Sequence, residues 1–153
     1  MSVSNSPGSW LPIVPGEIEL DDPAEIYMRQ CHPNFYIDGE PTSQMWREST
    51  GDNGKLSGAR SAKTSAEEAY HHRTEVVGRP SAGTFGVTVA EIGAAGTRAV
   101  DDSGADWGDF TCPPGHTFLD LRHLSDGERR SLRRRLAVAV RKNRRLWPED
   151  ETA

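Results

Sequence analysis

The chain has 153 residues, 35% of them hydrophobic, and its mean hydropathy is −0.67. This length favours a single domain, since one core typically uses about 100–200 residues. Two cysteines cannot build the disulfide framework of a small secreted protein, and no apolar run approaches the ~20 residues that cross a bilayer. Because the first residues lack the basic and apolar regions of a secretory signal, we expect a cytoplasmic protein with free thiols and no membrane contact.

Charge is distributed unevenly along the chain, although the formal net charge is only −5. Residues 1–121 carry 18 acidic and 8 basic side chains, whereas residues 122–145 carry 2 acidic and 10 basic ones. Such segregation is more informative about partners than the net value is. Together with the local patterns, it divides the chain into an extended N-terminal arm (1–22), an α+β body (23–121), a basic C-terminal helix (122–147) and an acidic tail (148–153).

The N-terminal arm is rich in proline, which disfavours a helix, and its residues 10–14 fit an edge strand or a partly ordered leader. Residues 26–31 form either a short helix or an extended segment. That segment ends at His32, because a residue before proline avoids the helical region. A loop with aromatic anchors follows, with a turn at Asp38-Gly39.

The centre of the body begins with its most polar stretch. Residues 47–63 are rich in glycine and predict a long loop, with a bend at Asn53-Gly54. Ser65 and Glu68 then have the spacing of a capping box, in which each side chain bonds the other residue's backbone N–H. This motif predicts a helix that runs to about residue 74.

The strand signals lie further along the chain. Phe85, Val87 and Val89 alternate with smaller residues, which predicts a half-buried strand within residues 81–92. Residues 93–108 are small and acidic and predict a loop. Residues 117–121 predict a second short strand.

A second capping box, Ser125 to Glu128, starts a helix that we expect to reach about Arg145. Its apolar residues recur at helical spacing, and Trp147-Pro148 would end it. The predicted fold class is therefore α+β, with a small mixed sheet, a middle helix and a basic amphipathic C-terminal helix. The apolar face of that helix comprises Leu132, Leu136, Ala139 and Val140.

The basic helix is the clearest functional signal. Arginines off its apolar face would present a row of guanidinium groups suited to phosphate, as in nucleic-acid contacts. An acidic protein surface is the alternative partner, and the acidic body of the same chain or plain solvent would satisfy the same charges. The candidate partner-binding residues are Arg130, Arg133, Arg134, Arg141 and Arg145.

The polar segment 52–60 is the candidate small-molecule or phosphate site. Its glycines let the backbone approach a ligand, its basic residues supply charge, and Ser57 supplies a hydroxyl. The spacing is not that of a phosphate-binding Walker loop, and an ordinary glycine-aspartate turn is the alternative. The candidate ligand-binding residues are Asp52, Lys55 and Arg60.

Several positions carry groups suited to acid–base chemistry. His32 could serve as a general base or could simply bond a loop, and the same alternatives apply to the pair His71-His72. Glu91 follows the predicted strand, which is a common place for a catalytic or a solvent-facing carboxylate. The cysteines and histidines do not show the repeated close pairs of a zinc site, so we expect no metal site.

The segment that begins at Arg29 resembles a pattern in small uncharacterised bacterial proteins. Its matching residues are Arg29, Gln30, His32, Pro33, Gln44, Trp46, the run 52–57, Arg60 and the run 64–67. The order of Arg29, Ser57 and Glu91 is also similar to that in ADP-ribosyltransferase-like proteins. That resemblance implies an arginine that grips NAD, a central serine and a catalytic glutamate at these three positions.

Two functional hypotheses follow. The first is a bacterial interaction protein of a toxin or defence system, whose basic helix contacts nucleic acid, another polyanion or an acidic protein surface. The alternative is a small enzyme that uses NAD or a phosphate ligand, with Arg29, His32, Ser57 and Glu91 as its catalytic residues. Neither hypothesis specifies a cofactor or an oligomeric state, and both leave open whether the basic helix docks on its own domain.

Overall fold

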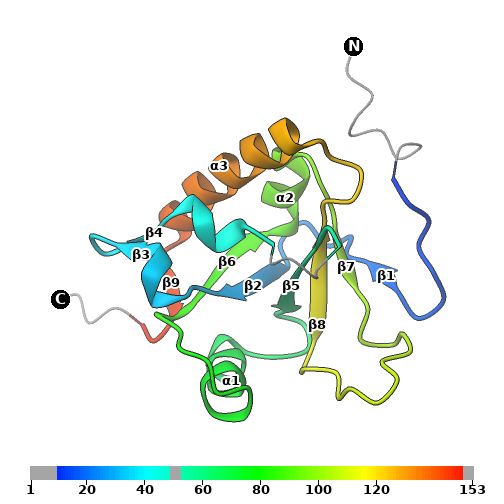
Figure 1. The fold of residues 1–153 in the computed structure, drawn as a ribbon, viewed down its shortest axis with the longest axis horizontal. Helices are drawn as coiled ribbons and strands as arrows, with labels where there is room; N and C mark the ends of the chain where they lie inside the picture. The colour runs from blue at the N-terminus through cyan, green and yellow to red at the C-terminus, as the bar shows by residue number, and fades with distance from the viewer. Residues whose placement is uncertain (1–9, 49–52, 150–153) are drawn as a thin grey trace.

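The computed structural model describes residues 10–48 and 53–149 of the chain (Figure 1). Within these ranges, seven strands form one antiparallel sheet in the order β1-β7-β8-β5-β2-β6-β9. The strands are β1 (Ile18–Glu19), β2 (Ile26–Gln30), β5 (Lys55–Arg60), β6 (Thr84–Thr88), β7 (Ala99–Asp101), β8 (His116–Asp120) and β9 (Arg145–Trp147).

Helices and one small hairpin complete the described structure. The hairpin turns at Asp38-Gly39, as expected, and both residues have positive φ, 54° and 79°. The elements are the hairpin strands β3 (Tyr36–Ile37) and β4 (Glu40–Pro41), the helices α1 (Ala66–His71), α2 (Val89–Ala95) and α3 (Asp126–Asn143), the 3-10 turns Pro33–Phe35 and Ser43–Trp46, and a π-helical turn His72–Val76. The predicted α+β class is confirmed.

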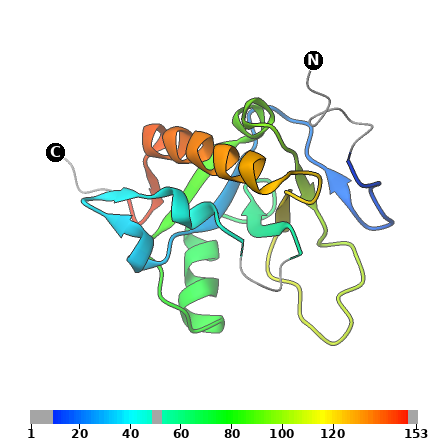
Figure 2. The same ribbon diagram turned by 45° about the horizontal axis from the view of Figure 1, so that its top comes forward.

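The sheet separates two layers of helix (Figures 1 and 2). On one face, α3 packs across β6 and against α2. On the other face, α1 contacts β2, β6 and β9, while β5 and β8 extend beyond it. The core therefore lies between the sheet and α2 and α3, and the face that carries α1 is only partly covered.

The core face of the sheet is built from large side chains of the central strands. Tyr27 of β2 and Leu56 of β5 are fully buried, and Phe85 and Val87 of β6 are buried beside them. The Tyr27 hydroxyl donates to the Leu56 carbonyl at 2.6 Å. This bond satisfies the polar end of a buried ring, which would otherwise cost free energy.

The C-terminal helix docks on its own domain. Its capping box is confirmed, since the Ser125 hydroxyl accepts from the Glu128 N–H at 3.2 Å and the Glu128 carboxylate accepts from the Ser125 N–H at 2.9 Å. Full burial of one aliphatic side chain contributes roughly 1.5–3 kcal/mol, so this apolar face is a substantial part of the core. The buried residues of α3 are Leu132, Leu136, Ala137 and Val140.

The expected loop over residues 47–63 is wrong for its second half, which forms the central strand β5. The bend at Asn53-Gly54 is confirmed, with φ of 53° and 79°, and it leads directly into that strand. β5 pairs with β2 on one side and β8 on the other. The small residues of β5 resemble a loop sequence, but pairing with β2 and β8 holds them in an extended strand. Pairing and packing here outweigh intrinsic propensity.

The strand predicted within residues 81–92 ends earlier than expected. The Thr88 hydroxyl accepts from the Glu91 N–H at 3.1 Å, and the Glu91 carboxylate accepts from the Thr88 N–H at 2.9 Å. This capping box turns the chain from β6 into α2. The expected loop over residues 93–108 therefore begins in a helix and also contains strand β7.

The basic helix is shorter than expected, because α3 ends at Asn143 rather than near Arg145. Arg144 has φ 64°, which breaks the helical path, and the next three residues form β9 beside β6. Trp147-Pro148 consequently closes a strand instead of a helix. The strand predicted over 117–121 is confirmed as β8.

The N-terminal arm supplies an edge strand later than the sequence suggested. β1, at residues 18–19, pairs with β7, whereas Leu11, Ile13 and Val14 are exposed. Trp10 packs its ring against the Arg98 guanidinium, 4.8 Å from the ring centroid. Across the described residues, no helix combines the length and apolar character needed to cross a bilayer.

Candidate functional site

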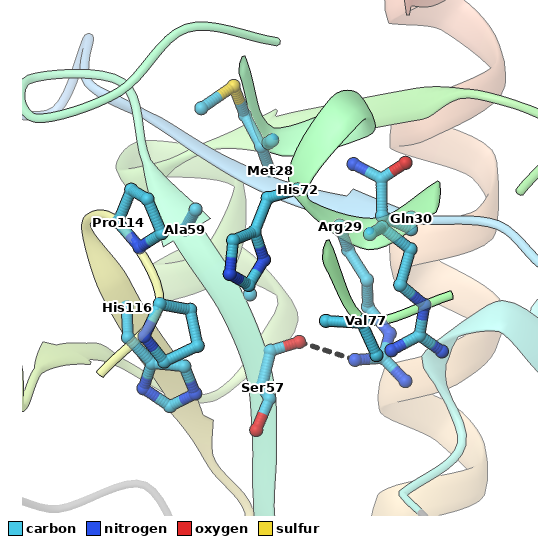
Figure 3. Close-up of a pocket in the computed structure, with 13 residues that line it drawn as sticks. Met28, Arg29, Gln30, Ser57, Ala59, His72, Val77, Pro114 and His116 are labelled. Atoms are coloured by element: carbon cyan, nitrogen blue, oxygen red, sulfur yellow. Dashed lines mark hydrogen bonds between the residues drawn. The ribbon is translucent and has the colours of Figure 1, made fainter. Parts of the chain in front are cut away.

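A cavity of about 280 Å³ lies on the partly covered face of the sheet (Figure 3). Met28 of β2 and Ser57 and Ala59 of β5 form its floor. One wall comes from α1 and the π-helical turn after it, and the opposite wall from residues 113–116 at the start of β8. Segments far apart in sequence therefore meet around one space.

Arg29 reaches this cavity from the end of β2. Its Nε donates to the Met45 carbonyl at 2.6 Å, and its Nη1 donates to the Ser57 carbonyl (Figure 3). Both acceptors are backbone oxygens, and among the described residues no carboxylate lies within ion-pair distance of Arg29. The guanidinium is thus held in place while further N–H donors stay available to a ligand.

A second arginine of the cleft, Arg73, lies near Arg29. Burial, and then the neighbouring guanidinium groups of Arg29 and Arg79, lower the pKa of Arg73 below its ordinary value. The Arg73 Nε is buried and has no hydrogen-bond partner in the part of the chain that the structure describes. Gathering like charges in a partly buried place costs free energy, and such an arrangement is typical of a site that receives an anion.

His116 lies on the opposite wall and is paired with a carboxylate. Its Nδ1 lies 2.6 Å from Asp102 Oδ1, and both side chains are largely buried. An ionised carboxylate only accepts hydrogen bonds, so we assign the proton of the neutral ring to Nδ1 and the lone pair to Nε2. The Trp107 indole packs edge-on against this ring with centroids 4.7 Å apart, and its Nε1 donates to the Asp102 carbonyl at 3.0 Å. The pair is therefore held in one orientation.

His72 enters the same space from the π-helical turn (Figure 3). Its ring has no hydrogen-bond partner among the described side chains, so both nitrogens can serve a ligand. The neighbouring His71 instead lies within ion-pair distance of Glu67 and Glu75 on the helix surface. The cavity thus has one histidine on each of two facing walls.

A second cavity, of about 370 Å³, adjoins the first and shares Arg29, Gln30 and Arg73 with it. The Gln30 amide is fixed at this border, because it donates to the Thr84 hydroxyl at 2.7 Å and accepts from the Ser81 hydroxyl at 2.7 Å. We call the two cavities together the arginine cleft. The remaining walls of its second part include His32, Asn34, Phe35, Arg47 and Glu48.

Three of the residues that the sequence singled out meet in the arginine cleft. Arg29 and Ser57 share its first cavity, and His32 lines its second. His32 is committed to the fold, since its Nδ1 accepts from the Asn34 N–H at 3.0 Å and caps a 3-10 turn. The hydrogen bonding of His32 therefore favours the alternative role, that of a histidine that bonds its own loop.

The other candidates lie elsewhere. Lys55 Nζ stands over the Phe118 ring, 5.0 Å from its centroid, and Arg60 faces the opposite side of the sheet because the side chains of a strand alternate. The two therefore do not form one ligand site, and Asp52 lies outside the described residues. Glu91, which caps α2, accepts from the Asn143 amide at 2.8 Å and does not line the arginine cleft.

The arginines of the C-terminal segment divide between internal contacts and solvent. Arg129 pairs with Glu48 at 3.0 Å. Arg141 and Arg145 donate to backbone carbonyls at 3.0 and 3.2 Å, so two of the proposed partner-binding residues already serve the fold. The proposed partner-binding residues that have no ion pair or hydrogen bond within the described ranges are Arg130, Arg133 and Arg134.

Both cysteines are free thiols, as expected. Burial raises the pKa of Cys31 to about 11, which keeps this thiol protonated and unreactive at neutral pH. In residues 10–48 and 53–149, no group of three or more His, Cys, Asp or Glu side chains is arranged to hold a metal ion.

The sequence did not indicate several residues that dominate the arginine cleft. Arg73 lies after the predicted helix start, in a stretch that gave no motif. The available signal was the run His71-His72-Arg73, in which three consecutive residues are histidine or arginine. Asp102 sits in the expected acidic loop, and its pairing with His116 depends on the unpredicted strand β7.

Comparison with known proteins gives no match, either to a protein family model, to a curated protein or to a solved structure.

Proposed function

We propose that the arginine cleft binds a small ligand through a phosphate group. The observation that carries this proposal is the placement of Arg29 and Arg73 in both cavities of the cleft without a carboxylate partner among the described residues. Arginine is suited to this role, since its planar fork of N–H donors matches the oxygens of phosphate.

The energetics support an anion rather than a neutral ligand. In the absence of a ligand, the buried Arg73 Nε and the repulsion between the Arg73 and Arg29 guanidinium groups are uncompensated costs. A phosphate would satisfy these donors and neutralise the repulsion in the same step. A neutral ligand could accept hydrogen bonds from these donors, but it would bring no negative charge to offset the repulsion between the guanidinium groups.

Nucleotides are the phosphate-bearing ligands that fit the surroundings best. The second cavity offers the Phe35 ring and the amides of Asn34 and Gln44 beside the arginines, which suit a base or a ribose. NAD belongs to this class, and Arg29 and Ser57 would then hold it as the resemblance to ADP-ribosyltransferase-like proteins implies. Glu91 would take no part, because it lies outside the cleft.

Isothermal titration calorimetry with inorganic phosphate, AMP and NAD tests this proposal. Substitution of Arg73 by Gln removes a charge-assisted hydrogen bond worth about 1.5–3 kcal/mol, so binding should weaken by roughly 10-fold or more. Arg144→Gln is the matched control, since this exposed arginine lies away from the cleft and should leave affinity unchanged. The proposal is overturned if none of the three probes binds, or if Arg73→Gln binds as the native chain does.

A second candidate function is polyanion contact through α3. It is favoured by Arg130, Arg133 and Arg134, whose charges no described residue neutralises, although the helix itself docks on its own domain. Nucleic acid and an acidic protein face are the partner classes that such a surface suits. The measurement that tests it is the affinity of the charge-reversed triple variant for RNA, as a function of salt.

A further inference from the structure

We propose that the first cavity of the arginine cleft cleaves RNA by transferring a phosphodiester to the neighbouring 2′-hydroxyl, with His116 as the base and His72 as the acid. This inference rests on the proposed phosphate site, which it deepens from binding to chemistry. The observation behind it is the placement of two imidazoles on facing walls, with arginines beside them (Figure 3).

His116 is the better base of the two histidines. Its Nδ1–H is held by Asp102 at 2.6 Å, which leaves Nε2 as the basic nitrogen on a ring that lines the cavity. A carboxylate at Nδ1 fixes the tautomer and stabilises the imidazolium that forms when Nε2 takes a proton. Trp107, which packs on the ring and bonds the Asp102 backbone, is a positioning residue.

His72 is suited to the acid. It stands on the other wall, and no described side chain competes for its ring nitrogens. The neighbouring arginines favour a phosphate between the walls, which brings the oxygens of that phosphate within reach of the His72 ring. The two histidines would thus serve opposite sides of one phosphodiester.

The reaction needs no group that the chain and the substrate do not supply. His116 Nε2 takes the 2′-hydroxyl proton as the O2′–P bond forms, and His72 gives a proton to the 5′-oxygen as the P–O5′ bond breaks. The products are a 2′,3′-cyclic phosphate and a free 5′-hydroxyl. Charge that develops on the phosphoryl oxygens faces Arg29 and Arg73, and such stabilisation is commonly the largest single contribution to catalysis.

The second cavity suits the rest of a single strand. The Phe35 ring offers a surface for a base, and Arg47 stands beside it as a phosphate contact. Arg47 also borders a further hollow whose lining has more basic than acidic side chains, namely Arg129, Arg130 and Arg133 of α3 beside Asp126 and Glu48, the latter paired with Arg129. A basic path thus leads from the two histidines around the 3-10 turn Ser43–Trp46 to the exposed side of α3.

The test uses the full chain and a 12-nucleotide RNA with a fluorophore and a quencher at its ends, in buffer containing EDTA. Cleavage should leave a 2′,3′-cyclic phosphate, identified by mass spectrometry. The DNA of the same sequence should stay intact, because it lacks the attacking hydroxyl. General acid–base groups contribute about 10²–10⁴-fold, so His72→Ala and His116→Ala should each lower the rate by at least roughly 100-fold.

The controls separate chemistry from folding and from binding. His71→Ala removes the adjacent histidine, which lies outside the cavity, and should retain full activity. His116→Gln preserves the size of the partly buried ring site and should be as inactive as His116→Ala, and Asp102→Asn should alter the pH profile. Cleavage that survives in the His72 and His116 variants would overturn the inference. Phosphate binding without RNA cleavage would overturn this inference alone, whereas absence of both would overturn the proposed function as well.

Discussion

At the scale of single residues, the buried charges of the sheet decide how stability depends on pH. Arg60 bridges Glu25 at 2.7 Å and Asp101 at 3.0 Å, and Lys63 reaches Asp101 at 2.7 Å. Burial alone would raise the pKa of Asp101, but hydrogen bonds from Lys63, Ser103 and Arg60 together hold it below its ordinary value. Arg60, singled out by the sequence as a ligand residue, is therefore engaged in a structural ion cluster.

The pH dependence of unfolding should change when Asp101 becomes Asn. A depressed carboxyl pKa stabilises the fold above its unfolded pKa, near 3.9, and this contribution is lost as the pH falls through the folded pKa. Asp101→Asn should thus lose about 3 kcal/mol at pH 7, where Arg60 is left partly unpaired, and its stability should fall less steeply between about pH 5 and pH 2.

Urea unfolding at several pH values measures both effects. Asp109→Asn is the control, since this exposed aspartate makes no contact within the described residues and should follow the native chain. Parallel pH profiles for the native chain and Asp101→Asn would contradict the assignment of a depressed pKa to this carboxyl.

At the scale of elements, local sequence signals predicted the starts of two helices better than the paths of strands. The capping boxes at Ser65 and Ser125 are formed as expected, because a cap needs only four consecutive residues. Strand β5 was missed because its identity depends on β2 and β8, which lie far away in sequence. The arginine cleft could not be predicted from the sequence for the same reason, because the segments that form its walls meet only in the folded sheet.

Gly58 shows how tertiary contacts fix β5. A Cβ at this position would lie 2.4 Å from Tyr27 Cζ and 2.5 Å from the Met28 carbonyl oxygen, so Gly58→Ala must displace the ring or the backbone. Overpacking of this kind costs about 1–3 kcal/mol. We expect a loss near the upper end of that range, measured as a lower urea midpoint.

Gly93 in α2 provides the opposite case. A Cβ there meets nothing within 4 Å, and alanine is the better helix former by about 1 kcal/mol, so Gly93→Ala should stabilise the protein slightly. For Gly58, the contradicting result would be a Gly58→Ala variant as stable as the native chain. That result would refute the close packing of Tyr27 over β5.

At the scale of the whole molecule, the arginines of α3 divide into those that contact the rest of the domain and those that have no partner among the described residues. Some arginines of α3 are used to dock the helix, through Glu48 and backbone carbonyls. The docking contacts do not neutralise Arg130, Arg133 and Arg134, of which Arg130 and Arg133 line the far end of the basic path from the arginine cleft.

This path predicts that affinity for RNA depends on the length of the strand, and that α3 contributes only to the binding of long strands. In the triple variant Arg130→Glu, Arg133→Glu, Arg134→Glu, AMP should bind as tightly as to the native chain, because the cavity is unchanged. A 12-nucleotide RNA, made uncleavable with 2′-deoxy residues, should bind more weakly, and the slope of log affinity against log salt should fall by about 2, since each lost phosphate contact removes ~0.7. The free energy of unfolding of the triple variant should stay within about 0.5 kcal/mol of the native value, because these side chains have no partner in the described chain.

Fluorescence anisotropy over a salt series measures the affinity for both ligands. Unchanged affinity for the long strand would remove nucleic acid as the partner of α3, and an equal loss for AMP would show that the reversal reaches the cavity itself.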